Sequence, residues 1–344
     1  MTKLPIILVL LIGIILSVIF SNDLNNLYNE KIYAHPFSRN ETASFVALTY
    51  QMQIESELVL LNLANDNVTL ARNHANKAAS LLTPTIIFEI VEGNTQTAKD
   101  LATALNNLRT VSSSSESQKQ IVSKLVSDIN ASLTEVVDVK TSQALTEKPS
   151  SSLEKGAEVI RGLFGSSGQG RDYYQADENT SIQPLAFAEL IDRVLVNYGS
   201  AYHVGFDMTN MSNMVMPAST TTDVNNSSRS NMNMDSMNMS PSTTTNTADQ
   251  INRNYSLVNI TDYQSAQALA TKALQMFNSK LKHIATNNNN KSNQSTFVTN
   301  LENGVSQLNN SIRNKASPLD IMMIAHTQIH PNLLEIFDLK IRKI

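Results

Sequence analysis

The sequence predicts an all-α fold made of two tandem antiparallel four-helix bundles, and three observations support this prediction. Glycine and proline are scarce, with 10 and 9 residues in a chain of 344, whereas a β-sandwich needs many Gly/Pro turns. Apolar residues recur three or four positions apart, as they do along residues 263–284, which is typical of an amphipathic helix. The chain also repeats itself, which indicates an internal duplication.

The repeat is clearest when the chain is shifted by 200 residues. The segment "LTEVVDV" at 133–139 then lies on "LLEIFDL" at 333–339 without a gap. The matched positions in this register are Leu101/Leu301, Leu105/Val305, Leu108/Leu308, Ile121/Ile321, Val122/Met322, Ile129/Ile329 and Leu133/Leu333. One gapless register over two helices indicates that the two halves are copies of one unit.

Towards the start of each copy the register changes. Ala75 matches Ala270 at an offset of 195, and Phe45 matches Phe187 at an offset of 142. The change places an insertion of about fifty residues in the second copy, between His203 and Ile260.

Each copy is expected to hold four helices that close their apolar stripes on one core. The expected helices are 42–64, 68–90, 95–109 and 116–138 in the first copy, and 182–206, 260–285, 294–313 and 317–339 in the second. Asn94, Thr261 and Ser317 suit N-cap positions, and Pro318 suits the first helical position after Ser317.

The predicted domains are an export signal or N-terminal anchor at 1–21, an extension at 22–41, a first bundle at 42–139, a linker at 140–181 with one short helix near 152–163, and a second bundle at 182–339 with a disordered Met-rich insertion at 207–257.

The N-terminus carries a targeting segment. An apolar run of 17 residues extends from Leu4 to Phe20, which favours a cleaved export signal, with an uncleaved anchor as the alternative. Either way the rest of the chain is expected outside the cytoplasm, secreted or held at the outer face of the membrane. The absence of cysteine excludes disulfides and thiolate metal sites. Asn-x-Ser/Thr sequons recur and are compatible with a glycoprotein.

The charge pattern argues against nucleic acid as a partner. The net charge is −4, and the 26 basic and 30 acidic side chains are spread along the chain without a basic stripe.

The second copy resembles the helical extracytoplasmic domain that precedes the permease part of bacterial high-affinity iron permeases. That family has a Tyr-x-x-Ala-x-x-x-Gly stretch, a Val-x-Asn loop, a helix containing Tyr and a final helix opened by a Lys/Arg-Ala-x-Pro turn. The matching residues are Tyr198, Ala201, Gly205, Val258, Asn259, Tyr263, Ala316, Pro318, Leu333, Leu334 and Phe337, although Val258 and Asn259 are adjacent here. The Arg-Glu-x-x-Glu helices that carry iron in the permease are absent from this sequence. The resemblance therefore implies an accessory related to metal handling rather than a transporter.

The insertion is rich in methionine, which suggests a copper site. Eight of the thirteen methionines fall within it: Met208, Met211, Met214, Met216, Met232, Met234, Met237 and Met239. Thioethers are soft ligands that suit Cu(I), and iron is the less favoured metal. A low-complexity loop without a ligand is the alternative, and it stays open. A core role for these methionines is not expected, because their neighbours are too polar to bury.

Three histidines are further candidate ligands. His203 adjoins the insertion, and His326 and His330 lie one helical turn apart behind Met322. The repeat register places His326 at a core position and His330 at a rim position, which favours structural roles. His74 is expected to be half-buried and His283 to face solvent.

No constellation of catalytic residues stands out, which predicts a protein that is not an enzyme. Glu89 and Glu92 share a helical face but lack an obvious partner, and a di-iron site would need Glu-x-x-His on facing helices. The favoured function is an exported binding or accessory protein for metal, with a membrane metal transporter or another exported protein as its partner. An extracellular scaffold or interaction module without metal is the alternative.

Overall fold

The computed structural model confirms an all-α fold. It describes residues 39–111, 115–146, 173–175, 182–209, 255–287 and 294–342. Across these ranges helices dominate, and the strands are two segments of three residues each. No helix within these ranges is both long and apolar enough to cross a bilayer. The predicted signal or anchor at 1–21, nearly all of the extension at 22–41, the linker helix near 152–163 and most of the insertion lie outside the described residues.

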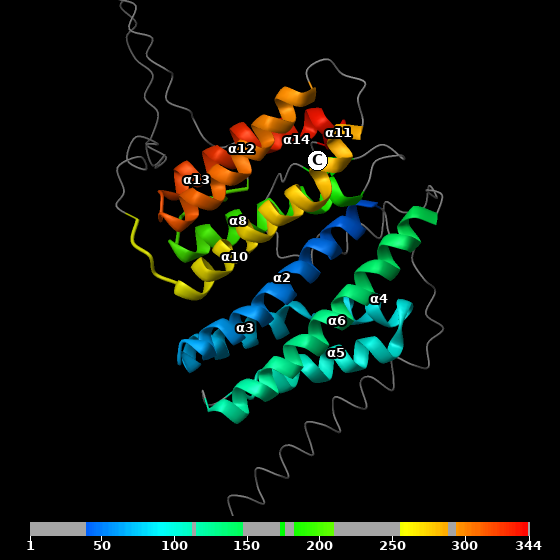
Figure 1. Ribbon diagram of the computed structural model, residues 1–344, viewed down its shortest axis with the longest axis vertical. Coiled ribbons are helices and arrows are strands. Elements are labelled where there is room, and N and C mark those ends of the chain that lie inside the picture. Colours follow the sequence, from blue (N-terminus) through cyan, green and yellow to red (C-terminus); the bar gives the residue numbers. More distant parts are fainter. Residues whose placement is uncertain are drawn as a thin grey trace, which may run out of the picture. The chain divides into compact units, whose positions relative to one another are not determined.

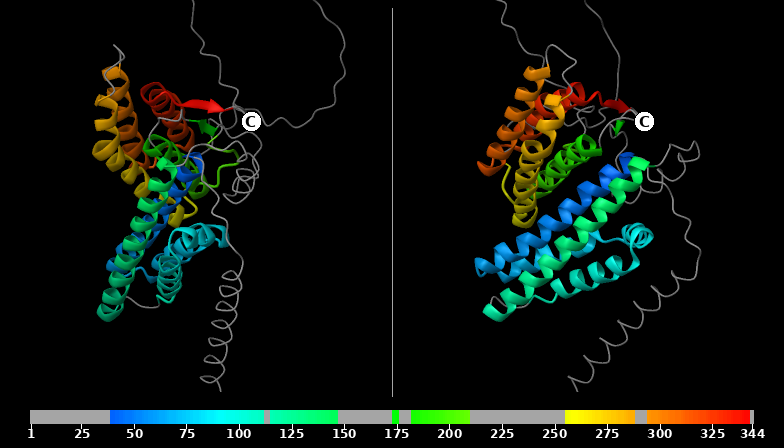
Figure 2. Two further views of the ribbon diagram at one scale, coloured as in Figure 1. Left: turned by 90° about the vertical axis from the view of Figure 1, so that its right-hand side faces the viewer. Right: turned by 45° about the vertical axis from the view of Figure 1, so that its right-hand side comes forward.

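The first half contains five helices rather than the expected four. They are α2 (Arg39–Ala64), α3 (Val68–Leu81), α4 (Pro84–Gly93), α5 (Thr95–Leu108) and α6 (Glu116–Thr146). The single helix expected over 68–90 is wrong, because Thr83 caps α4 and Pro84 occupies its first turn. A proline cannot continue the preceding helix, so α3 ends at Leu81. The views in Figure 2 show α2 and α6 side by side.

The second half follows the expected helices closely. It holds α8 (Ile182–Ala201), α10 (Ile260–Met276), α11 (Lys282–Asn287), α12 (Gln294–Arg313), α13 (Pro318–Ile324) and α14 (His330–Phe337). Two π-helical turns, η1 (Phe277–Leu281) and η2 (Ala325–Ile329), join α10 to α11 and α13 to α14. Pro331 follows η2 closely and has no N–H to donate, so a wider turn accommodates it within the helix. In Figure 1, α10 lies along α8.

The helix caps agree in part with those expected. Asn94 accepts hydrogen bonds from the backbone N–H groups of Gln96 and Thr97, and Ser317 accepts one from Asp320. The cap of α10 is Asn259 rather than Thr261, and its side chain accepts from the N–H of Asp262. These side chains satisfy backbone donors that have no partner inside the helix.

One antiparallel strand pair links the linker to the C-terminal end. Strand β1 (Tyr173–Gln175) pairs with β2 (Lys340–Arg342), with Tyr173 opposite Arg342.

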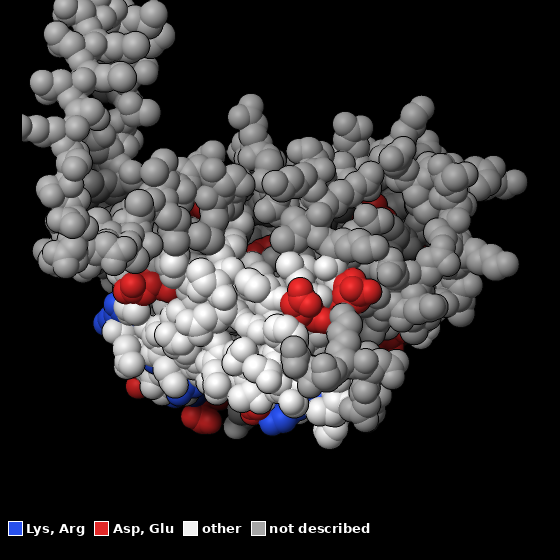
Figure 3. All heavy atoms as spheres, turned by 90° about the horizontal axis from the view of Figure 1, so that it is seen from above, with Lys and Arg blue, Asp and Glu red and all other residues white. Residues whose placement is uncertain are grey.

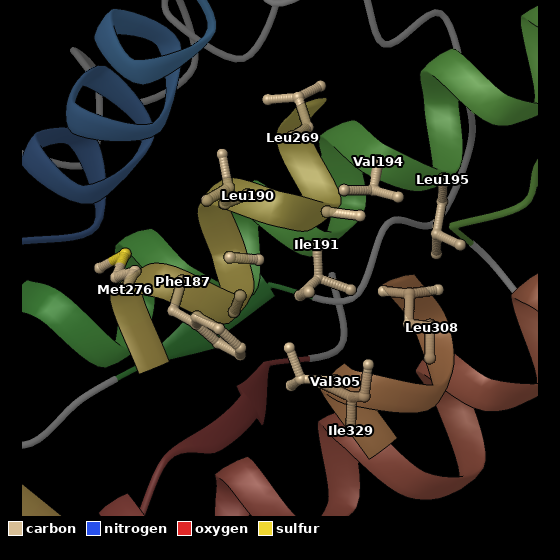
Figure 4. Close-up of a cluster of buried hydrophobic side chains, with 14 of the residues drawn as sticks. Phe187, Leu190, Ile191, Val194, Leu195, Leu269, Met276, Val305, Leu308 and Ile329 are labelled. Atoms are coloured by element: carbon tan, nitrogen blue, oxygen red, sulfur yellow. The ribbon is translucent and has the colours of Figure 1, made fainter. Parts of the chain in front are cut away.

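Two hydrophobic cores lie one in each half. The first half surrounds a core that includes Leu101, Leu105, Leu108, Ile129 and Leu133. The core of the second half draws on α8, α10, α12 and η2, as Figure 4 shows for Phe187, Leu190, Ile191, Val194, Leu195, Leu269, Met276, Val305, Leu308 and Ile329. All ten of these residues are buried, so the expected amphipathic stripes do close on cores.

Helix α2 contributes to both cores, which corrects the expectation of two self-contained bundles. Phe45, Leu48, Met52, Val59 and Leu63 enter the first core. Ala43, Val46, Tyr50, Ile54 and Leu58 enter the second core, and α2 packs against α8. A helix that is apolar all round must be buried on all sides, and α2 satisfies this by lying between the two sets of helices.

Burial is shared by most positions of the proposed repeat. Leu101 and Leu301, Leu108 and Leu308, and Leu133 and Leu333 are all fully buried. One pair differs, since Ile121 is 57% exposed whereas Ile321 is 0% exposed. Helix α5 packs against α4 and α6 of its own half, as the duplication requires. The duplication itself stays a prediction that this burial pattern supports.

Candidate functional site

The described residues on either side of the Met-rich insertion meet at the end of α8. The carbonyl oxygen of Ala201, at the end of α8, accepts the N–H groups of Val258 and Asn259 at 2.9 and 3.0 Å. His203 turns the chain away from α8 with a positive φ of 47°, and its side chain is exposed. The hydrogen bonds to Ala201 therefore hold together the described chain before and after the insertion.

Met208 belongs to the second core, so the expectation that the insertion methionines have no core role is wrong for this residue. It is only 3% exposed and lies against Gly199, where a Cβ would approach its sulfur to 3.0 Å. Its carbonyl oxygen is 3.0 Å from Nε2 of His326. Because a carbonyl only accepts, Nε2 of His326 carries the hydrogen. Met208 and His326 thus attach the start of the insertion to η2.

His326 and His330 lie together, as their spacing predicts. Their ring centroids are 5.0 Å apart and the rings are nearly perpendicular. His330 is buried rather than at the rim, which corrects the prediction from the repeat register. Burial, with a smaller contribution from His326, lowers the pKa of His330 to about 3, so its imidazole is neutral at ordinary pH. Nε2 of His330 is 3.6 Å from Oδ1 of Asp192, which is too long for a hydrogen bond.

The other methionine ligands predicted in the insertion lie outside the described residues. They are Met211, Met214, Met216, Met232, Met234, Met237 and Met239. Met322 is buried in the second core beside η2. Within the described part of the chain, no three His, Asp or Glu side chains form a group suited to a metal ion.

Tyrosines that matched the iron-permease domain fasten the turn before α13. The Tyr198 hydroxyl donates to the carbonyl of Ala316 at 2.6 Å, and the Tyr263 hydroxyl donates to that of Ile312 at 2.8 Å. Burial raises the pKa of both hydroxyls, so they stay protonated donors. The residues behind the resemblance therefore have packing and anchoring roles here.

A buried polar cluster that the sequence did not reveal joins the two halves. Glu55 of α2 and His74 of α3 are fully buried, and Oε2 of Glu55 lies 2.7 Å from Nδ1 of His74. The other ring nitrogen of His74 is 2.8 Å from Oε1 of Gln264 on α10. The Ser265 hydroxyl donates to Oε1 of Glu55 at 2.7 Å. The half-buried position expected for His74 is thus wrong, because Glu55 of α2 and Gln264 of α10 both contact its ring.

Lys77 extends this cluster by one helical turn. Its ammonium donates to Asn197 at 2.6 Å and to Ser265 at 2.9 Å, and it forms an ion pair with Asp262. Oε1 of Glu55 is 3.4 Å away. We call Glu55, His74, Lys77, Asp262 and Ser265 the joint cluster. The sequence did contain one indication of this cluster, namely the charged Glu55 inside the apolar run of α2, because a buried charge needs a partner.

A second buried cluster joins α4 to α6. Nζ of Lys140 is 3.3 Å from Oε2 of Glu89 and 3.5 Å from Oε2 of Glu92. The sequence placed Lys140 in the linker, but α6 continues to Thr146 and carries it back over α4. We call these three residues the α4–α6 cluster. A hollow beside it is lined by Glu89, Ile90, Gly93, Asn94, Glu135, Val136, Val139 and Lys140.

On the described part of the face shown in Figure 3, acidic and basic side chains are scattered among uncharged ones.

Comparisons with known proteins add no relative. No protein family, curated protein or solved structure matches the chain. The resemblance to the iron-permease domain therefore stays a prediction, and the function must be argued from the residues themselves.

Proposed function

We propose that this chain is an exported, non-enzymatic accessory protein of metal handling that binds Cu(I) through its Met-rich insertion. The observation that carries the proposal is at the base of the insertion, where the carbonyl oxygen of Ala201 accepts the N–H groups of Val258 and Asn259 and so holds together the chain before and after the insertion. A segment attached in this way can rearrange around an ion without disturbing either helical core. The membrane metal transporter or exported protein expected from the sequence would be its partner.

Ligand chemistry supports copper over iron. Seven methionines lie between residues 210 and 240 with spacings of two or three residues in two groups. Uncharged thioether sulfurs prefer soft Cu(I), whereas iron prefers oxygen and nitrogen ligands. The segment from 208 to 254 contains no histidine, so tight Cu(II) binding is not expected from it.

A scaffold without metal is the second candidate, and the joint cluster favours it. Buried charges that connect α2 and α3 to α8 and α10 hold the two halves in one arrangement. A fixed arrangement of helices suits presentation of a surface to another protein. The two candidates differ in what the insertion does, so one titration separates them.

The test replaces Met232, Met234, Met237 and Met239 by Leu in the full chain and measures Cu(I) affinity by competition with a chelator. Loss of these sulfurs should weaken binding by about tenfold or more, which corresponds to about 1.4 kcal/mol or more. Helix content should not change, because none of these four residues belongs to a helix that the structure describes. The matched control replaces Asn231, Asn233 and Asn238 by Ala and keeps all sulfurs.

Equal competition by the wild type and the fourfold variant would overturn the copper proposal and leave the scaffold. If affinity falls only after His326 and His330 are replaced, the metal binds on the last helix instead. Zn(II), which is a harder ion than Cu(I), serves as the comparison and should bind the segment more weakly than Cu(I).

A further inference from the structure

The α4–α6 cluster holds more negative than positive charge in a buried place. The side chains of Glu89, Glu92 and Lys140 are 9%, 4% and 4% exposed. Two ionised carboxylates against one ammonium would leave one uncompensated negative charge there. Such a charge is costly to bury, and a buried site with excess charge takes up a proton instead.

The positions of the carboxyl groups also favour a bound proton. Glu89 and Glu92 both lie within 3.5 Å of the single ammonium group of Lys140, and one positive charge cannot balance two buried, ionised carboxylates. Oε1 of Glu92 is buried and has no hydrogen-bond partner among the described residues, so this oxygen does not have the solvation that an ionised carboxylate needs.

The surrounding helices supply little compensation. Helix α4 packs against α5 and α6. The charged residues of α5 are Lys99 and Asp100, and both are exposed. On α6, Lys140 faces the carboxyls, while Glu135 lines the hollow, is exposed and accepts a hydrogen bond from Asn94 at 2.8 Å.

We propose that Glu89 and Glu92 share one proton beside Lys140, and that release of this proton loosens α4 from α6. The two acids and the lysine would then act as a proton-sensitive latch within the first half. The latch is independent of the metal-binding proposal, because none of its residues belongs to the insertion.

The direction of the pH dependence follows from the titration of Glu89. Burial raises its pKa to about 7, Lys140 opposes this in part, and Glu92 adds to it. A raised pKa means that the folded state binds the proton more tightly than the unfolded state does. The resulting stabilisation is complete below the ordinary pKa of 4.5 and is lost as pH rises through about 7.

The experiment compares the full chain with Glu89→Gln and with the matched control Glu135→Gln. The amide of Gln can donate to Glu92 as a protonated Glu89 would. Between pH 5.5 and 7.5, the folding equilibrium constant of the wild type should fall about 10- to 20-fold more than that of Glu89→Gln, as expected for one proton linked to folding. Glu135→Gln should follow the wild type, because its carboxylate is exposed.

A second set of measurements tests the shared proton without relying on the folding equilibrium. The infrared carbonyl band of a protonated carboxyl group should be present in the wild type at pH 6, decrease by pH 8, and be absent from Glu89→Gln at pH 6. Amide exchange in α4 should rise with pH more steeply in the wild type than in Glu89→Gln. Equal pH dependence in both proteins, or no protonated carboxyl band at pH 6, would overturn the latch.

Discussion

The joint cluster and the α4–α6 cluster are both buried groups of acids and bases, yet their hydrogen bonding differs. In the joint cluster, both oxygens of Glu55 and both ring nitrogens of His74 have close partners. In the α4–α6 cluster, Lys140 lies 3.3 and 3.5 Å from two carboxyls, which is longer than the usual distance for charged pairs. Both carboxylate oxygens of Glu55 in the joint cluster thus have partners, whereas Oε1 of Glu92 in the α4–α6 cluster has none among the described residues.

The difference shows what each cluster can do. A fully hydrogen-bonded buried network holds its neighbours in one arrangement, because any displacement leaves charges without partners. A network with excess negative charge instead depends on a proton, and its strength varies with pH. The same residue types therefore produce a fixed connection between the halves and an adjustable connection within the first half.

The largest expected effect comes from Glu55→Ala. Removing this carboxylate leaves the buried His74 without its acidic partner and takes one acidic neighbour from the part-buried Lys77, which should lower the free energy of unfolding by about 3–5 kcal/mol. Urea denaturation at pH 7 measures the change. The control, Glu57→Ala, removes an exposed carboxylate two residues away and should cost about 0.5 kcal/mol or less. Similar losses for the two variants would contradict the special role of the joint cluster.

A smaller, pH-dependent effect is expected for Lys140→Met. Two carboxyls then lack their cation, so the free energy of unfolding should fall by about 3 kcal/mol at pH 8. The loss should shrink at pH 5, because burial raises the pKa of Glu89 to about 7 and this carboxyl then holds a proton, which leaves less negative charge beside the missing cation. Thermal melting at both pH values tests this, with the exposed Lys124→Met as control, for which about 0.5 kcal/mol or less is expected. If the loss were the same at both pH values, the α4–α6 cluster would not differ from the joint cluster in its dependence on a proton.

The smallest effect is expected for Ser265→Ala. This change removes the hydroxyl that donates to Glu55 at 2.7 Å and accepts from Lys77 at 2.9 Å, while His74 and Lys77 remain near the carboxylate. The two lost hydrogen bonds should together cost about 1–2 kcal/mol. The exposed Ser279→Ala, whose hydroxyl donates to Gln275 in its own helix, should be nearly neutral in the same denaturation experiment. A loss as large as that of Glu55→Ala would mean that Ser265, not the charge balance, maintains the joint.

Much of the helical architecture could be predicted, because it depends on local signals. Residues Gln294–Arg313 form α12 with the predicted bounds, and Ser317 and Pro318 begin α13 as expected. The break between α3 and α4 was also readable, since Thr83 and Pro84 carry a cap and a helix breaker.

The candidate sites were predicted less well. Burial of Met208 could not be read from its polar neighbours, because it depends on contact with Gly199 of α8. The spacing of His326 and His330 did bring the two rings together. The burial of His330, in contrast, depends on packing around η2 that local spacing does not describe.

The sequence by itself determined the all-α class, most helix bounds and the apolar stripes, because caps, prolines and helical periodicity act over a few residues. Only the tertiary structure decided that α2 serves two cores and that Glu55 meets Ser265 across 210 positions of chain. It also decided that Lys140 lies over Glu89 and Glu92. Such partners come together through the packing of whole helices, and no local pattern specifies which distant charge will complete a buried cluster.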